Sequence, residues 1–478
     1  MPRTIRPATK IVATIGPATS SDTMIRALIE AGVDVFRLNF SHSDPEMHAS
    51  VAKSIRKISS LLDIPVAILQ DLQGPKIRVG EFEGGGPITL SAGDRITLTS
   101  KPVVGNAKLV PTTYEHIAED TKPGDIILLD DGNLELRVLD SKDTDVLCEV
   151  VRGGFLYEHK GINLPGVPLS TPALTEKDIQ DLKIGRELEV DYVALSFVRK
   201  PSDVELAKKI LRDLDSDAPV ISKLEKPEAI ANLDDILCVS DGVMVARGDL
   251  GVEMPPERVP IIQKQVIRKC QERGLPAITA TQMLESMISS PRPTRAEASD
   301  VANAILDGTD AVMLSGETAV GKYPVEAVRM MRRIAMETEK SIPTRKTESF
   351  TNMNPVRALS DAACSMAEDL PEVCAVVPMT RSGYTAQIMS STRVSVPILA
   401  YTYSEKVRRR LALWWGVRAL LMPKQDRIED SVAWVEQDLL DRGYVEPGSM
   451  ILITGGMPIP GPTKTNFIKL HVVAGSDT

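Results

Sequence analysis

The chain has 478 residues, of which 43% are hydrophobic and 25% charged, and its formal net charge is −9. This length and composition predict a soluble globular protein of two to four domains, and the acidic balance argues against a general nucleic-acid-binding role. No apolar run approaches the ~20 residues of a membrane span, and the N-terminus lacks the apolar segment of a signal peptide. Five scattered cysteines without a C-x-x-C pair fit a reduced, cytoplasmic setting with no membrane partner.

Eight short apolar runs, most of them separated by helical patterns, occur in the first 345 residues. The runs are residues 10–16, 33–41, 65–71, 191–198, 219–225, 242–249, 276–281 and 311–315. Alternation of strands and helices predicts a parallel sheet, and eight units favour a closed (β/α)8 barrel, whose active site lies at the C-terminal strand ends. The polar residues that fall at those ends are Arg37, Asn39, Asp71, Ser196, Lys223, Glu225, Asp249, Thr281 and Ser315.

The second run ends in side chains suited to phosphate and cation binding. Arg37, Asn39 and Ser41 share one face of the expected strand. An arginine there suits a bidentate phosphate contact, and Asn39 and Ser41 offer oxygens to a cation together with Asp71. The alternative is an ion pair between Arg37 and Asp71. His42 is more typical of a loop residue than of a general base.

The third and fourth barrel strands are separated by a segment with a different pattern. Residues 88–98 resemble two strands around a turn, and residues 126–129, 134–139 and 145–151 continue the short-strand pattern. We therefore expect an all-β insertion at residues 72–171, between the barrel segments 1–71 and 172–345. Its place at the functional end of the barrel suits a lid, and a surface module is the alternative.

Lys223 and Glu225 place opposite charges two residues apart in an apolar strand, so both point to one face. They could form an internal ion pair. Asp249 ends the next apolar run and adds a second carboxylate on a neighbouring strand. Oxygen ligands without nearby histidine or cysteine predict Mg²⁺ or Mn²⁺. Lys223 could form a Schiff base or neutralise a phosphoryl group, and the adjacent metal favours the second role.

The pattern changes again after about residue 345. Strands are expected at residues 375–380, 396–402, 417–422, 450–454 and 468–473, with helices between them, so residues 346–478 are expected to form an α/β domain. A loop that follows the first of these strands combines hydroxyls, backbone N–H groups and an arginine at a helix start, which predicts an anion site; an ordinary capped helix is the alternative. The loop residues are Thr380, Arg381, Ser382, Gly383 and Thr385.

These motifs together resemble the pyruvate kinase family, through essentially the whole chain. The resemblance is carried by residues 36–42, 72–80, 160–166, 222–225, 246–251, 280–287 and 314–321. It implies a barrel with a β lid and a C-terminal α/β domain, usually assembled as a homotetramer. It also implies phosphoryl transfer from phosphoenolpyruvate to ADP, giving pyruvate and ATP.

The resemblance implies a role for each matching residue. Lys223 would stabilise the transferring phosphoryl group and the enolate, Arg37 would hold phosphate, and Glu225 with Asp249 would hold the divalent metal. Thr281 would help deliver a proton. Further substrate contacts are expected from Ser196, Gly248, Asp249 and Thr281. Nucleotide contacts are expected from Arg78, Lys160, His42 and Ser315. A phosphorylated effector is expected at the loop of residues 380–385, with Lys464 on a facing loop.

Lys76 departs from the pattern of many family members, which have a glutamate there and require K⁺. In those members, oxygens at the positions of Asn39, Ser41 and Asp71 hold K⁺, and a threonine occupies the position of Leu72. Because Lys76 reverses the charge, we expect its ammonium to replace K⁺ and the monovalent site to be vestigial. Two other functions remain open: a metal-dependent barrel lyase or aldolase, and a non-catalytic metabolite sensor.

Overall fold

The computed structural model describes residues 6–41, 44–342, 354–457 and 464–474, and within them eight parallel strands close into a barrel. Around the barrel the strands follow the order β1-β16-β15-β14-β13-β12-β3-β2. Their bounds are β1 (Lys10–Thr14), β2 (Val35–Asn39), β3 (Ala67–Asp71), β12 (Tyr192–Leu195), β13 (Val220–Leu224), β14 (Gly242–Ala246), β15 (Ala277–Ala280) and β16 (Ala311–Leu314). The predicted fold class is confirmed.

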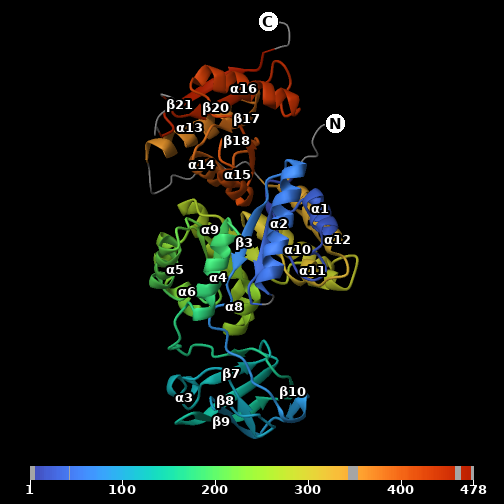
Figure 1. The fold of residues 1–478 in the computed structure, drawn as a ribbon, viewed down its shortest axis with the longest axis vertical. Coiled ribbons are helices and arrows are strands. Elements are labelled where there is room, and N and C mark those ends of the chain that lie inside the picture. Colours follow the sequence, from blue (N-terminus) through green and yellow to red (C-terminus); the bar gives the residue numbers. More distant parts are fainter. Residues whose placement is uncertain (1–5, 42–43, 343–353, 458–463, 475–478) are drawn as a thin grey trace.

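The barrel strands are buried along nearly their whole length, which explains why they read as continuous apolar runs in the sequence. Helices surround them (Figure 1), and several begin with a side-chain cap, such as the reciprocal bonds between Thr294 and Glu297. The helices are α1 (Asp22–Ala31), α2 (Pro45–Leu62), α4 (Glu176–Glu187), α5 (Pro201–Asp213), α6 (Pro227–Ala231), α7 (Leu233–Val239), α8 (Arg247–Glu253), α9 (Val259–Arg273), α10 (Arg295–Leu306), α11 (Gly316–Ala319) and α12 (Pro324–Glu339).

A β-rich domain, called the lid below after its predicted role, follows β3 and lies at one end of the barrel, at the bottom of Figure 1. Its elements are β4 (Ile88–Leu90), β5 (Arg95–Thr99), β6 (Leu109–Pro111), α3 (Ile117–Asp120), β7 (Ile126–Leu129), β8 (Leu134–Lys142), β9 (Asp145–Arg152), β10 (Gly154–Leu156) and β11 (Ile162–Asn163). The two strands expected within residues 88–98 are present, but they do not pair with each other: β4 pairs with β10, and β5 pairs with β9 and β6.

The C-terminal α/β domain lies at the opposite end of the barrel (Figure 1). Its sheet has the order β19-β18-β17-β20-β21. Its elements are α13 (Pro355–Asp369), β17 (Val373–Pro378), α14 (Tyr384–Thr392), β18 (Ile398–Thr402), α15 (Glu405–Arg410), β19 (Val417–Leu421), α16 (Ile428–Asp441), β20 (Met450–Gly455) and β21 (Phe467–Val472). Each of its five strands overlaps a predicted one. No helix among the described residues is long and apolar enough to cross a membrane.

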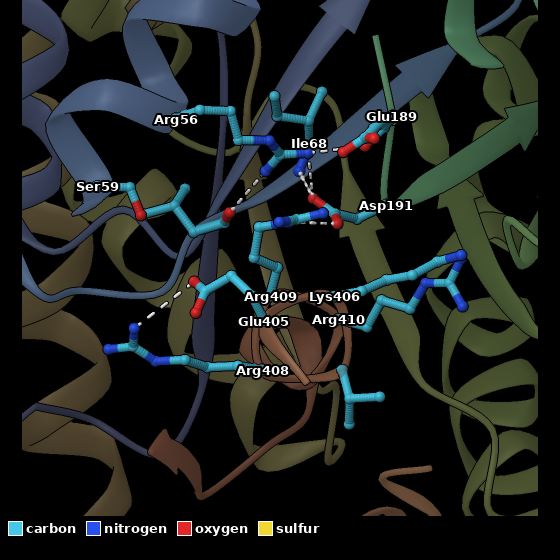
Figure 2. Close-up of polar contacts among 12 residues, drawn as sticks. Arg56, Ser59, Ile68, Glu189, Asp191, Glu405, Lys406, Arg408, Arg409 and Arg410 are labelled. Atoms are coloured by element: carbon cyan, nitrogen blue, oxygen red, sulfur yellow. Dashed lines mark hydrogen bonds and ion pairs between the residues drawn. The ribbon is translucent and has the colours of Figure 1, made fainter. Parts of the chain in front are cut away.

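Helix α15 joins the C-terminal domain to the N-terminal ends of the barrel strands through charged contacts. Figure 2 shows Arg409 and Arg56 converging on the buried carboxylate of Asp191, at 2.9 and 2.8 Å. The neighbouring Arg408 pairs with Asp63. Charge-assisted bonds of this kind are stronger than neutral ones, so the C-terminal domain is fixed to the end of the barrel remote from the lid.

Candidate active site

Four charged side chains form a buried network at the C-terminal ends of neighbouring barrel strands. Lys223 Nζ, at the end of β13, lies 2.8 Å from Glu225 Oε1 and 3.1 Å from Asp71 Oδ1. Arg37 Nε of β2 lies 2.6 Å from the other oxygen of Asp71. Both ion pairs that the sequence left open as alternatives are therefore present, and they join the two predicted clusters into one.

Burial and charge compete in setting the ionisation of this network. Burial acts to raise the pKa of Asp71, but Lys223 and Arg37 hold it below its usual value. Burial acts to lower the pKa of Lys223, yet Asp71 and Glu225 outweigh it and the pKa is raised, so the ammonium stays charged. The pKa of Glu225 is raised by burial and by Asp249, against the opposing effect of Lys223. The proximity of Asp249 makes ionised Glu225 costly without a further cation.

Glu225 and Asp249 approach each other from different elements. Glu225 follows β13 directly, and its Oε2 accepts the N–H of Phe197 at 2.8 Å. Asp249 does not end a strand, contrary to our expectation: β14 stops at Ala246, and Asp249 lies in the first turn of α8. Among the described residues no cluster of three or more carboxylate, histidine or cysteine ligands occurs, so the protein offers two carboxylates. Such a pair fits Mg²⁺, which usually keeps waters and substrate oxygens in its shell.

The oxygens expected around a monovalent cation are largely engaged by protein groups. Asn39 Oδ1 accepts the N–H of Ser41 at 3.2 Å, and Asp71 is held by two cations. Leu72 is buried, and its carbonyl accepts the Ser196 hydroxyl at 2.7 Å. Ser196 in turn accepts a hydrogen bond from Lys223 at 2.6 Å, so it belongs to the ammonium's surroundings.

Thr281 and Gly248 lie close together just beyond the C-terminal ends of β15 and β14. Thr281 follows β15, and its hydroxyl accepts the N–H of Gly248 at 2.7 Å and donates to the carbonyl of Ala280 at 2.6 Å. A Cβ at position 248 would lie 3.4 Å from Thr281 Oγ1, in van der Waals contact with it. Ser315, beyond β16, donates its N–H to Glu317 at 2.7 Å.

The lid brings its predicted residues to the same end of the barrel without joining them to the buried network. Arg78 donates to the carbonyl of His159 at 2.9 Å, and Lys160 pairs with Asp130 at 2.8 Å. Lys76 is exposed and lines a crevice between lid and barrel that Asp249 also lines. His42 lies outside the described residues.

A second buried ion pair, beside Glu225, was missed in the sequence. Lys226 Nζ lies 2.6 Å from Glu253 Oε1, which also accepts the side-chain N–H of the lid residue Asn163 at 2.8 Å. The contact joins the barrel to the lid. Lys226 follows Glu225 directly, so its place beside a candidate site residue could have drawn attention to it. Nothing in the sequence pairs it with Glu253, which is 27 positions away.

The predicted effector loop forms the start of α14. Thr380 Oγ1 accepts the N–H of Gly383, which has a left-handed φ of 86°, and the hydroxyls of Thr385 and Thr465 are 2.6 Å apart. A cavity of about 250 Å³ beside this loop is lined by Thr380, Arg381 and also Lys424, which sequence reasoning missed. Ser382, Gly383, Thr385 and the exposed Lys464 are not among its lining residues.

Comparison with known proteins gives matches along nearly the whole chain. Residues 6–328 match the family model "Pyruvate kinase, barrel domain", and residues 357–471 match "Pyruvate kinase, alpha/beta domain". Pyruvate kinase 2 of Synechocystis sp. is 48% identical over 97% of this chain and 79% of its own. The pyruvate kinase of Mycobacterium intracellulare is 45% identical over 98% and 99% of the two chains. A crystal structure of a pyruvate kinase from Cryptosporidium parvum has a TM-score of 0.89 and 35% identity, covering 98% and 96%.

Proposed function

The chain belongs to the pyruvate kinase family, and on that premise we propose how its residues carry out the family reaction. That reaction transfers a phosphoryl group from phosphoenolpyruvate to ADP. The bond between the enol oxygen and phosphorus breaks, and a bond forms from phosphorus to a β-phosphate oxygen of ADP. The enolate left behind takes up one proton at its methylene carbon to become pyruvate. Such a transfer depends on positioning and charge neutralisation more than on covalent catalysis.

Lys223 is the proposed centre of this chemistry. The observation that carries the proposal is its buried ammonium, 2.8 Å from Glu225 and 3.1 Å from Asp71. A preorganised cation in a water-poor site stabilises charge that develops on the phosphoryl group and the enolate. Arg37, held in place by Asp71, would bind phosphate. Ser196 and the backbone at Gly248 would complete the substrate contacts.

Pyruvate kinases are metal-dependent, and we assign the divalent ion, Mg²⁺ or Mn²⁺, to Glu225 and Asp249. When bound, the ion would polarise substrate oxygens as a Lewis acid. Thr281 would help deliver the proton to the enolate. Its hydroxyl hydrogen is directed to the Ala280 carbonyl, so delivery requires rotation of the hydroxyl and a water molecule as the proton source.

Pyruvate formation measured with and without ADP tests the function. ADP-dependent formation is the expected result. ADP-independent turnover of phosphoenolpyruvate would favour the lyase class, and absence of turnover would favour a non-catalytic sensor.

The proposed nucleotide contacts are Arg78 and Lys160 of the lid, with Ser315 and His42. Arg78→Met should therefore raise KM for ADP far more than KM for phosphoenolpyruvate.

Lys76 is proposed to make the reaction largely independent of K⁺. Its charge and its place in the crevice beside Asp249 support this, as does the pairing of both Asp71 oxygens by cations. Adding K⁺ to a buffer without Na⁺ should raise activity by less than about tenfold, or ~1.4 kcal/mol. Lys76→Glu should create a requirement for K⁺, whereas Lys122→Glu, an equal charge reversal at an exposed lid turn, should not. A larger effect of K⁺ on the parent protein refutes the proposal.

The loop before α14 is proposed to bind a phosphate-ester activator in the cytoplasmic homotetramer that is usual for the family. Backbone N–H groups at the start of a nine-residue helix, together with Arg381 and Lys464, suit a phosphate group. Ser382→Asp would place a carboxylate there and should abolish activation by a panel of sugar phosphates while leaving basal turnover unchanged. Unchanged activation removes this loop from consideration.

A further inference from the structure

Thr281 has a backbone conformation that its side chain disfavours. Its φ is 68° and that of Gln282 is 55°, so two successive residues are left-handed. For a β-branched residue this is a genuine outlier, because the Cβ substituents crowd the backbone. Such conformations persist only where the surroundings hold them, and they concentrate at functional sites. The contacts that hold this segment therefore bear on how the Thr281 hydroxyl is placed.

The guanidinium of Arg247, the first residue of α8, provides those contacts. Its Nη2 donates to the Thr281 carbonyl at 2.8 Å, and its Nε donates to the Ala280 carbonyl at 3.3 Å. Asp300 of α10 binds the same guanidinium with both oxygens, at 2.8 and 2.7 Å. The Arg247 side chain is only 11% exposed. A planar fork of donors suits this task, since one cation fixes successive carbonyls and a carboxylate at once.

The same contacts determine where the Thr281 hydroxyl points. The hydroxyl donates to the Ala280 carbonyl, which Arg247 also binds, and accepts the N–H of Gly248, the neighbour of Arg247 in the chain. We infer that Arg247, oriented by Asp300, is a positioning residue that keeps the Thr281 hydroxyl at the reacting carbon. This inference rests on the proton-delivery role proposed for Thr281. It assigns Arg247 an effect on the proton transfer and not on the phosphoryl transfer.

A purely structural role for Arg247 predicts a different pattern. The residue also lies 2.9 Å from Met283 Sδ and 3.4 Å from Gln263 Oε1, so its loss could loosen α8 as a whole. Loosening of α8 would displace Asp249 as well and would slow both chemical steps together. A positioning role slows proton transfer selectively, because the network of Lys223 and Asp71 makes no contact with Arg247 among the described residues.

Exchange of the methyl hydrogens of pyruvate for deuterium separates the two steps. The full-length protein is incubated in D₂O with pyruvate, ATP and Mg²⁺, and exchange is followed by NMR beside steady-state turnover. Arg247→Met should lower the exchange rate by about 100-fold, the scale expected for misplacement of a reacting group. It should also raise the solvent deuterium isotope effect on kcat and leave KM for phosphoenolpyruvate within about threefold, a small energetic change. Amide hydrogen exchange at residues 277–284 should increase.

Two further variants and a control make the result decisive. Asp300→Asn should produce the same selective effect more weakly, and it carries the test should Arg247→Met fail to fold. Arg56→Met removes an arginine that also binds two carbonyls and a carboxylate, but at the opposite end of the barrel, and should leave the exchange rate unchanged. Parent-like exchange in the folded Arg247 and Asp300 variants, or an equal fall in exchange and turnover with an unchanged isotope effect, overturns the inference.

Thr281→Val distinguishes failure of this inference from failure of the proposed function. If Thr281→Val retains exchange, the proton-delivery role falls and the inference about Arg247 falls with it. If Thr281→Val loses exchange while Arg247→Met keeps it, Thr281 retains its role and only the inference about Arg247 is wrong. Loss of exchange in both, with the isotope effect raised, supports both.

Discussion

Replacement of Lys223 by methionine should slow turnover by about 10³-fold and at the same time tighten divalent metal binding. In the present arrangement the ammonium occupies one oxygen of Glu225, at 2.8 Å, which is a proposed metal ligand. A metal ion must share or displace that contact, and two unit charges about 4 Å apart interact by about 4 kcal/mol at an effective dielectric constant of 20. Most of the energy lost with the Glu225 contact is offset in the parent protein, because Lys223 keeps its contact with Asp71 at 3.1 Å.

A net gain of ~1.4 kcal/mol corresponds to about tenfold tighter Mn²⁺ binding in the variant. Turnover should fall by about 10³-fold, because loss of one preorganised charge-stabilising group costs about 3–4 kcal/mol in the transition state. Mn²⁺ affinity is measured by electron paramagnetic resonance and turnover by pyruvate formation. Lys10→Met, which removes a buried lysine that donates to the Val417 carbonyl at the other end of the barrel, is the control and should change neither. Weaker Mn²⁺ binding in the Lys223 variant, or turnover within about tenfold of the parent, refutes this reasoning.

Three further outcomes follow from the contacts between domains. Asp191→Asn should lower the free energy of unfolding by about 3 kcal/mol in urea, because it leaves two arginines partly uncompensated at a buried site, whereas Asp217→Asn, 68% exposed, should cost less than about 1 kcal/mol. Burial acts to raise the pKa of Asp217, but Arg410 and Lys406 lower it to about 2, below its unfolded value. The small contribution of Asp217 to the free energy of unfolding should be complete above about pH 4 and lost as the pH falls toward 2. The stabilities of the parent and of Asp217→Asn should therefore converge near pH 2. Asn163→Leu removes a lid contact to Glu253 and should raise KM for ADP by about tenfold with a smaller change in kcat; an unchanged KM would mean that this contact does not hold the lid.

The barrel strands could be predicted because burial on both faces leaves an uninterrupted apolar run between turn residues. The same property hid the end of β14. The apolar run from Val243 ends at Ala246, and α8 begins at the next residue without a side-chain cap, so no start signal in the sequence separates the strand from the helix that contains Asp249. Asp249, the carboxylate predicted to bind metal, was therefore assigned to the wrong element, and its role stays a prediction.

Partners far apart in the sequence set the limit of prediction for the rest. The strands β4 and β5 were recognisable, but β4 pairs with β10, about 65 residues later, and β5 pairs with β9, about 50 residues later. Arg409 and Asp191 are separated by 218 positions, and each alone reads as an ordinary surface charge. Arg247 lies within one of the recognised stretches, residues 246–251, but its proposed action through Thr281 was not predicted. That action depends on the carbonyl directions of a strained segment, which only coordinates reveal.

The charges of the buried network bear on the order in which ligands bind. Arg37 and Lys223 contribute two positive charges and Asp71, Glu225 and Asp249 three negative ones, so the group has a net charge of −1. A substrate that carries both phosphate and carboxylate would meet net repulsion there, and one divalent cation reverses the sign to +1. If Glu225 and Asp249 hold that cation, as proposed, Glu225 would turn from the ammonium toward it, and Lys223 would be free to contact the incoming phosphoryl group. A lysine suits this exchange better than an arginine, since its single charge sits on a flexible stem that can change partners. We therefore expect the metal to bind before or together with phosphoenolpyruvate.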